Sequence, residues 1–355
     1  MTTPDPTAAL AAAASTVAAR RGYLATASTG LPSQAVLAAV QNALAAWAGG
    51  RLGPEEAVAL VERARGLFAR LLATTPDRVA AGSQASVAVG VVAACVPDGG
   101  RVLCAEGDYT SLTWPFAAHA HRGVRVETAP LAHLPEVLAA GRHDWVAVSA
   151  VQSADGRVLD LARLRAAAAE AGARVLLDTT QAVGWLPLRA DTADVTVTSL
   201  YKWVPAPRGA CLTTFGERAL AELRPSAAAA RAAAEGSDPF YGWPPRLRPD
   251  ARRFDVAPAW AAWAGAVPAL ETALALGVEA VHAHDVRLAD ALLQALGSPP
   301  AGSAVVSVPA SEAARAALAA AGLRTSLRGG RVRLAFHWWN DEEDVELAAT
   351  ALRAR

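Results

Sequence analysis

Residues 174–202 read RVLLDTTQAVGWLPLRADTADVTVTSLYK, and this stretch decides the fold. It contains two short runs rich in Val and Leu, Arg174–Asp178 and Asp194–Thr198, which read as buried strands. Asp178 closes the first run, and Lys202 follows the second. Ligands gather at the carboxyl ends of the strands of a parallel sheet. Neighbouring parallel strands would therefore deliver an acid and an amine into one crevice.

Lys202 is the only lysine in a chain that has 33 basic residues. An arginine stays charged, whereas a lysine amine can lose its proton when desolvated and attack a carbonyl. Pyridoxal 5′-phosphate (PLP) requires such an amine for a Schiff base, and a carboxylate to keep its ring nitrogen protonated. Structural roles compete with this interpretation, because Asp178 could cap a helix and Gln181 could be an ordinary residue of its first turn.

The pattern around this stretch alternates helical segments with short apolar strands. Pro54 to Thr74 and Leu161 to Ala171 read as helices, the latter ending at Gly172. Further strands are expected at Arg101–Ala105, Val124–Glu127 and Trp145–Ala150. Such alternation predicts an α/β fold with a mainly parallel sheet covered on both faces. The segment after about residue 258 predicts a smaller α+β domain.

We predict a large domain over residues 20–245, and a small domain formed by residues 1–19 and 246–355. The formal net charge is zero, which disfavours nucleic-acid and membrane-surface partners. No apolar run reaches the ~18 residues of a membrane span, and no signal peptide is expected. Three cysteines in apolar contexts indicate reduced thiols in a cytoplasmic protein. The histidines lack metal-ligand spacing, so no metal site is expected.

The constellation resembles the class V aminotransferase group of fold-type I PLP enzymes, which includes cysteine desulfurases, kynureninase and isopenicillin N epimerase. The family pattern is an Asp, a Gln or His three residues on, and a Ser-x-(His/Tyr)-Lys about two dozen positions later. The resemblance implies a seven-stranded sheet in the large domain. It also implies that Asp178 binds the ring nitrogen, Gln181 the ring hydroxyl, Ser199 and Tyr201 the phosphate, and that Lys202 carries the Schiff base.

The same resemblance extends to five further positions. Ser83 and Gln84 match the phosphate cradle, and their Gly-Ser loop before a helix would also present N–H groups to an anion. Tyr109 stands where the family stacks a side chain on the cofactor ring, and Ser153 partly matches a cofactor-contacting residue. Arg333 matches the clamp for the substrate carboxylate. A tyrosine packed under a loop and a solvent-facing strand arginine are the competing interpretations of Tyr109 and Arg333.

The resemblance implies an enzyme that transforms an amino acid, as a homodimer with PLP, and we favour an aminotransferase. The alternative is a carbon–sulfur lyase or epimerase that works without a catalytic cysteine, because no cysteine stands in the C-terminal domain where desulfurases carry theirs. Ala257-Pro258 replaces a family Gly-Thr pair whose Thr often binds the phosphate of the partner subunit. A binding module without activity is disfavoured because Lys202, Asp178 and Gln181 occur together.

Overall fold

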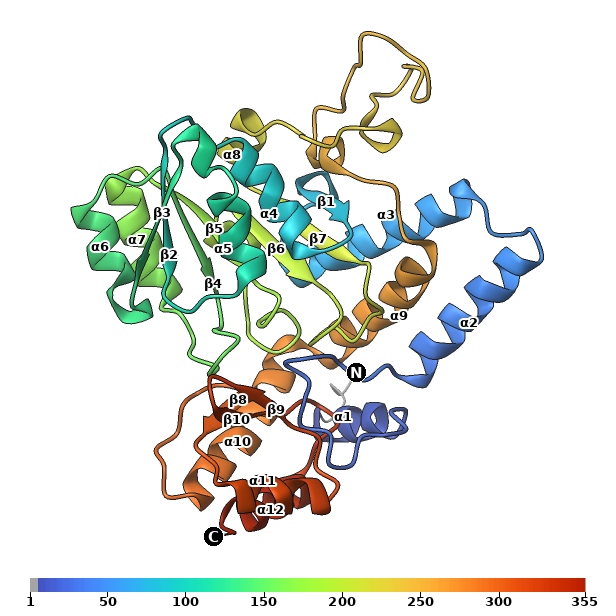
Figure 1. Ribbon diagram of the computed structural model, residues 1–355. Helices are drawn as coiled ribbons and strands as arrows, with labels where there is room; N and C mark the ends of the chain where they lie inside the picture. Colours follow the sequence, from blue (N-terminus) through green and yellow to red (C-terminus); the bar gives the residue numbers. More distant parts are fainter. Residues whose placement is uncertain (1–5, 355) are drawn as a thin grey trace.

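The computed structural model describes residues 6–354, in which a large sheet and a small sheet are each flanked by helices. In Figure 1 the small sheet lies below the large one, with α10, α11 and α12 around it. The strands are β1 Val79–Gly82, β2 Arg101–Ala105, β3 Arg125–Ala129, β4 Trp145–Ser149, β5 Arg174–Asp178, β6 Val195–Ser199, β7 Cys211–Phe215, β8 Val305–Val308, β9 Ser326–Arg328 and β10 Arg331–Ala335.

The α-helices alternate with these strands along most of the chain. They are α1 Pro6–Ala14, α2 Gln34–Ala48, α3 Pro54–Leu71, α4 Ala85–Ala94, α5 Thr110–Ala117, α6 Leu134–Ala140, α7 Leu161–Ala171, α8 Glu217–Glu222, α9 Trp260–Leu276, α10 Val278–Ala295, α11 Glu312–Ala320 and α12 Glu342–Leu352. Helix α7 has the bounds that the sequence predicts, because Asp160 caps its start and Gly172 ends it in a left-handed conformation.

The large sheet has seven strands in the order β1-β7-β6-β5-β4-β2-β3, and the small sheet has the order β8-β10-β9. Strands β2 to β6 pair in parallel, and β7 runs antiparallel to both of its neighbours. The predicted α/β class with a mainly parallel seven-stranded sheet is confirmed. Strands β5 and β6 are neighbours, so the two ends expected to carry the acid and the amine do lie side by side.

Side chains alternate along each strand, and helices bury both faces of the central strands. On β4, Val146 and Val148 face one core cluster, which includes residues of α6 and α7. Trp145 and Ala147 face another, which includes residues of α4 and α5. Strands buried on both faces read as continuous apolar runs, which is why periodicity identified them.

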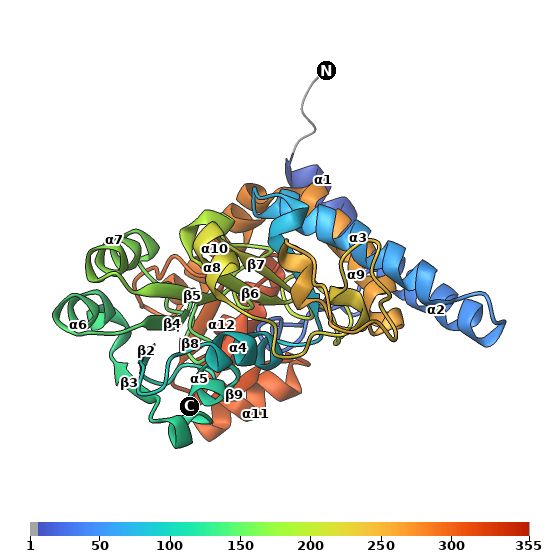
Figure 2. The same cartoon turned by 90° about the horizontal axis from the view of Figure 1, so that it is seen from above.

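Helix α9 connects the two sheet units and packs against α2 and α3. Figure 2 shows α2 projecting from the body beside α3. Residues Ala251–Phe254 pack on β1, and Val256 N–H donates to the carbonyl of Ala81. The chain just after residue 245 therefore contacts the large sheet, and the division at residues 245 and 246 stays a prediction.

The segment before this passage is mostly irregular and carries the exposed aromatic residues Phe240, Tyr241 and Trp243. Across residues 6–354, no single helix has both the length and the apolar character needed to cross a membrane. Only the bent pair α9 and α10, at 82° to each other, meets those criteria jointly.

Candidate active site

A cavity of about 280 Å³ opens at the carboxyl ends of the central strands, against the first turn of α4. Nine of the ten site residues predicted from the sequence line it. They are Ser83, Gln84, Tyr109, Ser153, Asp178, Gln181, Ser199, Tyr201 and Lys202. The tenth, Arg333, bonds to Ser153 from β10 of the small sheet. Residues up to 250 positions apart thus converge on one site.

Asp178 is the last residue of β5 and is only 5% exposed. The N–H of Thr180 donates to its Oδ1 at 2.8 Å. Burial raises the pKa of the carboxyl, while the hydrogen bond from Thr180 and the charge of Lys202 oppose the rise. A cationic group beside Asp178 would therefore hold it ionised.

Lys202 lies three residues beyond the end of β6 and is 6% exposed. Burial lowers the pKa of its amine to about 8, an effect that Asp178 opposes and that the charge of Arg333 reinforces. Within residues 6–354 its Nζ makes no hydrogen bond, and lies 5.5 Å from the ring centroid of Tyr109 and 5.6 Å from that of Tyr201. A larger fraction of this amine is therefore neutral near pH 7 than of an exposed lysine, and no hydrogen bond occupies it.

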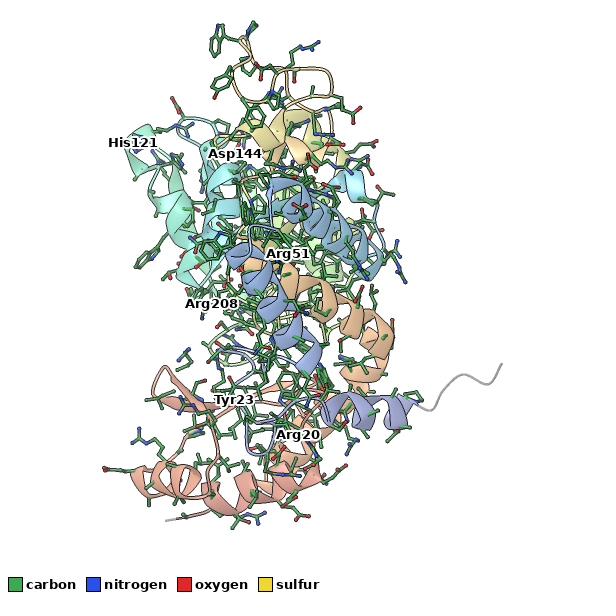
Figure 3. All side chains as sticks on the ribbon, turned by 90° about the vertical axis from the view of Figure 1, so that its right-hand side faces the viewer. Arg20, Tyr23, Arg51, His121, Asp144 and Arg208 are labelled. Carbon is green, nitrogen blue, oxygen red and sulfur yellow. The ribbon has the colours of Figure 1, made fainter. Side chains whose placement is uncertain are left out.

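The first turn of α4 forms the opposite end of the cavity. Gln84 is its N-cap residue and provides no side-chain cap, while Ala85 N–H donates to Ser199 Oγ at 3.1 Å. Arg208 lines the same cavity, with its guanidinium carbon 4.0 Å from the ring centroid of Tyr201. Figure 3 shows Arg208 at the level between the large unit and the segment that carries Tyr23. A helix start and a guanidinium favour an anion here.

Gln181 links the cavity to its surroundings through both ends of its amide. Its Nε2 donates to the carbonyl of Ala27 at 2.9 Å and to Ser153 Oγ at 3.1 Å, while its Oε1 accepts from Trp203 Nε1 at 2.9 Å. The Ala27 and Trp203 bonds hold the amide in place. The Nε2–H that now donates to Ser153 is the one that could donate to a ligand instead.

Arg333 is buried, with only 1% of its surface exposed, although it lies on a strand of the small sheet. Its guanidinium donates to the carbonyl of Ser153, and to the hydroxyls of Ser28 at 2.7 Å and Ser326 at 3.1 Å. In the part of the chain that the structure describes, no carboxylate forms an ion pair with it. Burial lowers the pKa of Arg333 to about 10. A buried cation without an acidic partner favours an anionic ligand.

The family model that describes class V aminotransferases matches residues 22–326, which is most of the chain. The chain belongs to the class V aminotransferase family. Among curated proteins, isopenicillin N epimerase of Streptomyces clavuligerus is 30% identical over 214 residues, an alignment that covers 54% of this chain and 54% of the epimerase. The match therefore spans about half the length of that relative.

Solved structures of the same fold extend over nearly the whole chain. The cystine C–S lyase C-DES, in complex with cysteine persulfide, has a TM-score of 0.83 at 20% identity and covers 95% of this chain and 98% of its own. The cysteine desulfurase CsdA of Escherichia coli has a TM-score of 0.80 at 20% identity, with coverage of 99% and 98%. The fold is therefore that of the fold-type I PLP enzymes.

PLP is the cofactor of this class V family, and the cavity residues fit it. Lys202 offers a buried amine with a lowered pKa, and Asp178 offers a buried carboxylate that a protonated ring nitrogen would hold ionised. The uncapped start of α4 and Arg208 offer donors and positive charge to a phosphate. The cavity thus provides for the aldehyde, the ring nitrogen and the phosphate.

Sequence reasoning missed several residues that hold this class V site together. Asp108 accepts from Ser149 N–H and from Gln152 Nε2, which fixes the loop that carries Tyr109. Ser28 supports Arg333 from 305 positions away. A charged residue directly before Tyr109 was a signal for Asp108, whereas nothing in the local sequence marks Ser28.

The cysteines do not line the site, although Cys211 pairs with Ser199 across the sheet. Cys104 and Cys211 are fully buried, and burial raises the pKa of each thiol to about 12. Cys95 contacts the backbone of Arg224. None of the three lines the cavity around Lys202. No cysteine thiolate is therefore available to act as a nucleophile there.

Proposed function

We propose that the protein transforms an amino acid at Lys202, and that the reaction is transamination. The observation that carries the proposal is the buried, carboxylate-free guanidinium of Arg333 on one side of a buried amine with a pKa of about 8. Arg333 would hold the α-carboxylate bidentately in place of its serine partners. The Lys202 amine, which would hold the cofactor, would then serve as the base for the Cα proton.

PLP, when bound, supplies an electron sink for the bond that breaks at Cα. Asp178 would keep the ring nitrogen protonated, because the two opposite charges stabilise each other in a dry site. Lys202 would take the proton from Cα onto Nζ and hold it for the return step, since its pKa of about 8 makes both uptake and release accessible near neutral pH. Tyr109 would cover the ring, and Arg208 with the start of α4 would hold the phosphate.

The second candidate is β-elimination, including cleavage of a carbon–sulfur bond. It uses the same groups up to the removal of the Cα proton, and it needs no cysteine. The location of the three cysteines outside the cavity favours this form over a persulfide-forming desulfurase. Epimerisation, the reaction in the name of the curated relative, would share the removal of the Cα proton and differ in returning it to the opposite face of Cα.

The test is to incubate the PLP-loaded protein with single L-amino acids and to measure keto acid with and without an amino acceptor. Transamination predicts one equivalent of keto acid per site without an acceptor, and turnover only with one. Repeated turnover without an acceptor would contradict transamination and establish elimination. Formation of the D-amino acid without keto acid would contradict both. For a variant of Arg333, Arg331→Gln is the matched control, because Arg331 lies on the same strand as Arg333 but bonds to Ser307 outside the cavity.

We also propose a homodimer in the cytoplasm. The family resemblance supports the dimer, and the three unpaired cysteines support a reducing compartment. Light scattering after gel filtration tests the first part, since a mass near twice 36.4 kDa is expected. A monomer at micromolar concentration would contradict it. Fractionation of the producing cells tests the second part.

A further inference from the structure

Two buried side chains of the small domain form a hydrogen-bonded pair that contacts the backbone next to Lys202. Asp285 lies on α10 and His337 lies two residues after β10, and neither is exposed to solvent. His337 Nδ1 lies 2.8 Å from Asp285 Oδ2. His337 Nε2 lies 2.9 Å from the carbonyl oxygen of Trp203, the residue that follows Lys202. The pair thus connects the small domain to the peptide beside the reactive amine.

The carbonyl of Trp203 determines which ring nitrogen of His337 carries a proton. A carbonyl oxygen only accepts hydrogen bonds, so Nε2 must be protonated and donate to it. Nδ1 then either donates to an Asp285 carboxylate or accepts from an Asp285 carboxylic acid. Burial raises the pKa of Asp285 well above its usual value and lowers that of His337 to about 3, and both shifts favour the neutral form of each group. Asp285 Oδ1 has no hydrogen-bond partner, as suits the carbonyl oxygen of a neutral acid.

The peptide on either side of Lys202 is confined from several directions. Gly30 N–H donates to the carbonyl of Tyr201 at 2.9 Å, and a Cβ at Gly30 would lie 2.0 Å from the carbonyl oxygen of Lys202. Gly184, at φ +111°, brings its backbone close to the carbonyl of Trp203, where a Cβ would lie 2.6 Å from the oxygen. His337 supplies the hydrogen bond to that oxygen. A small rotation of this peptide would redirect the lysine side chain.

The same contact also leads to the substrate clamp. The Trp203 ring meets the His337 ring edge-on at 5.1 Å, and its Nε1 donates to Gln181. Gln181 and Arg333 both donate to the hydroxyl of Ser153. Arg333 stands four residues before His337 on one continuous segment. A movement of this segment would therefore act on the carboxylate clamp and on the lysine peptide together.

We propose that Asp285 and His337 form a positioning pair that ties the small domain to the peptide after Lys202 and fixes the direction of the Lys202 amine. Asp285 acts as a hydrogen-bond donor that holds His337 in the tautomer with Nε2–H. His337 in turn holds the carbonyl of Trp203. Neither residue lines the cavity around Lys202. The inference rests on the proposed role of Lys202 as attachment point and proton carrier.

Three variants test the pair, each as the full-length PLP-loaded protein. Asp285→Asn keeps a donor toward Nδ1, so it should retain kcat within about twofold and leave the pH titration of the cofactor absorbance unchanged. Asp285→Leu removes the donor, and His337→Phe keeps the aromatic packing but removes both hydrogen bonds. Asp285→Leu and His337→Phe should lower kcat about 100-fold and change KM less. A loss of this size is expected when a reacting group is misplaced by about an ångström. Both variants should also shift the absorbance titration.

The comparison of Asn with Leu at position 285 separates positioning from bulk stability. Equal loss of kcat in Asp285→Asn and Asp285→Leu would contradict a neutral donor and point to a carboxylate paired with imidazolium. An unchanged kcat and titration in His337→Phe, with only a lower melting temperature, would reduce the pair to a structural role and overturn the proposal. If a Leu or Phe variant does not fold, His337→Gln decides, since its amide N–H can still reach Trp203 and should retain the wild-type titration.

Failure of this inference can be told apart from failure of the proposed function. Lys202→Ala abolishes the absorbance band if Lys202 binds the cofactor, whatever the state of Asp285. A wild-type protein that shows the band and acts on amino acids, with His337→Phe behaving like it, would overturn the positioning pair alone. A wild-type protein without the band would overturn the proposed function itself.

Discussion

The proposed role of Arg333 in binding the substrate carboxylate gives the sharpest quantitative prediction. Replacing Arg333 by glutamine removes a buried charge that would make two hydrogen bonds to the substrate carboxylate. Truncating one partner of a buried, hydrogen-bonded charge pair costs about 2–5 kcal/mol, which corresponds to a loss of about 30- to 5,000-fold in affinity. The loss of affinity should fall between these two limits, because the serine hydroxyls that now contact Arg333 can partly rearrange around the substituted side chain.

The assay is a titration of the cofactor absorbance with an L-amino acid and with the matching amine that lacks the carboxylate. Arg333→Gln should weaken binding of the amino acid and leave binding of the amine nearly unchanged. Arg331→Gln should change neither, since Arg331 is exposed and bonds to Ser307. Equal losses for amino acid and amine would refute the clamp. An equal effect of Arg331→Gln would show that the effect is one of strand charge rather than of a bound carboxylate.

Three further predictions follow from the site. Asp178→Asn should lower the single-turnover rate about 100-fold or more while the absorbance band persists, because the stabilising charge beside the ring is lost. Arg208→Gln should weaken PLP binding at least tenfold, measured by equilibrium dialysis, with the melting temperature of the cofactor-free protein unchanged. In the cofactor-free protein the pKa of Lys202 is about 8 instead of 10.5, so the unfolded chain binds more protons between these pH values. Stability relative to Lys202→Met should therefore rise by about 3 kcal/mol from pH 8 to 10.5, measured by urea denaturation.

The sheet and its reactive edge were predictable because they depend on local patterns. Arg174–Asp178 is an apolar run that ends in a carboxylate, and the structure has that strand with the same bounds. Parallel pairing of this strand with its successor places Asp178 opposite Val197. The chain direction at a strand end then determines where Asp178 and Lys202 lie. Short-range pattern and one topological rule were sufficient for this part of the site.

The supporting contacts were not predictable, because they join residues that are distant in sequence. Ser28, Ser153 and Ser326 surround Arg333 from three separate segments. The alternation of Arg331 and Arg333 predicts a shared face of the strand. Tertiary packing nevertheless buries Arg333 and leaves Arg331 exposed. The pair of Asp285 and His337 spans 52 positions, and its protonation depends on burial that no local pattern reports.

The central claim is that Lys202 carries PLP, and reduction of the loaded protein tests it most directly. The protein is saturated with PLP, its visible absorbance band is recorded, and sodium borohydride is added before digestion and mass spectrometry. We predict that the band disappears on reduction, that the peptide containing Lys202 gains the mass of the reduced cofactor, and that Lys202→Ala shows neither effect. A wild-type protein without the band, or with the cofactor mass on any peptide other than that of Lys202, would contradict the claim.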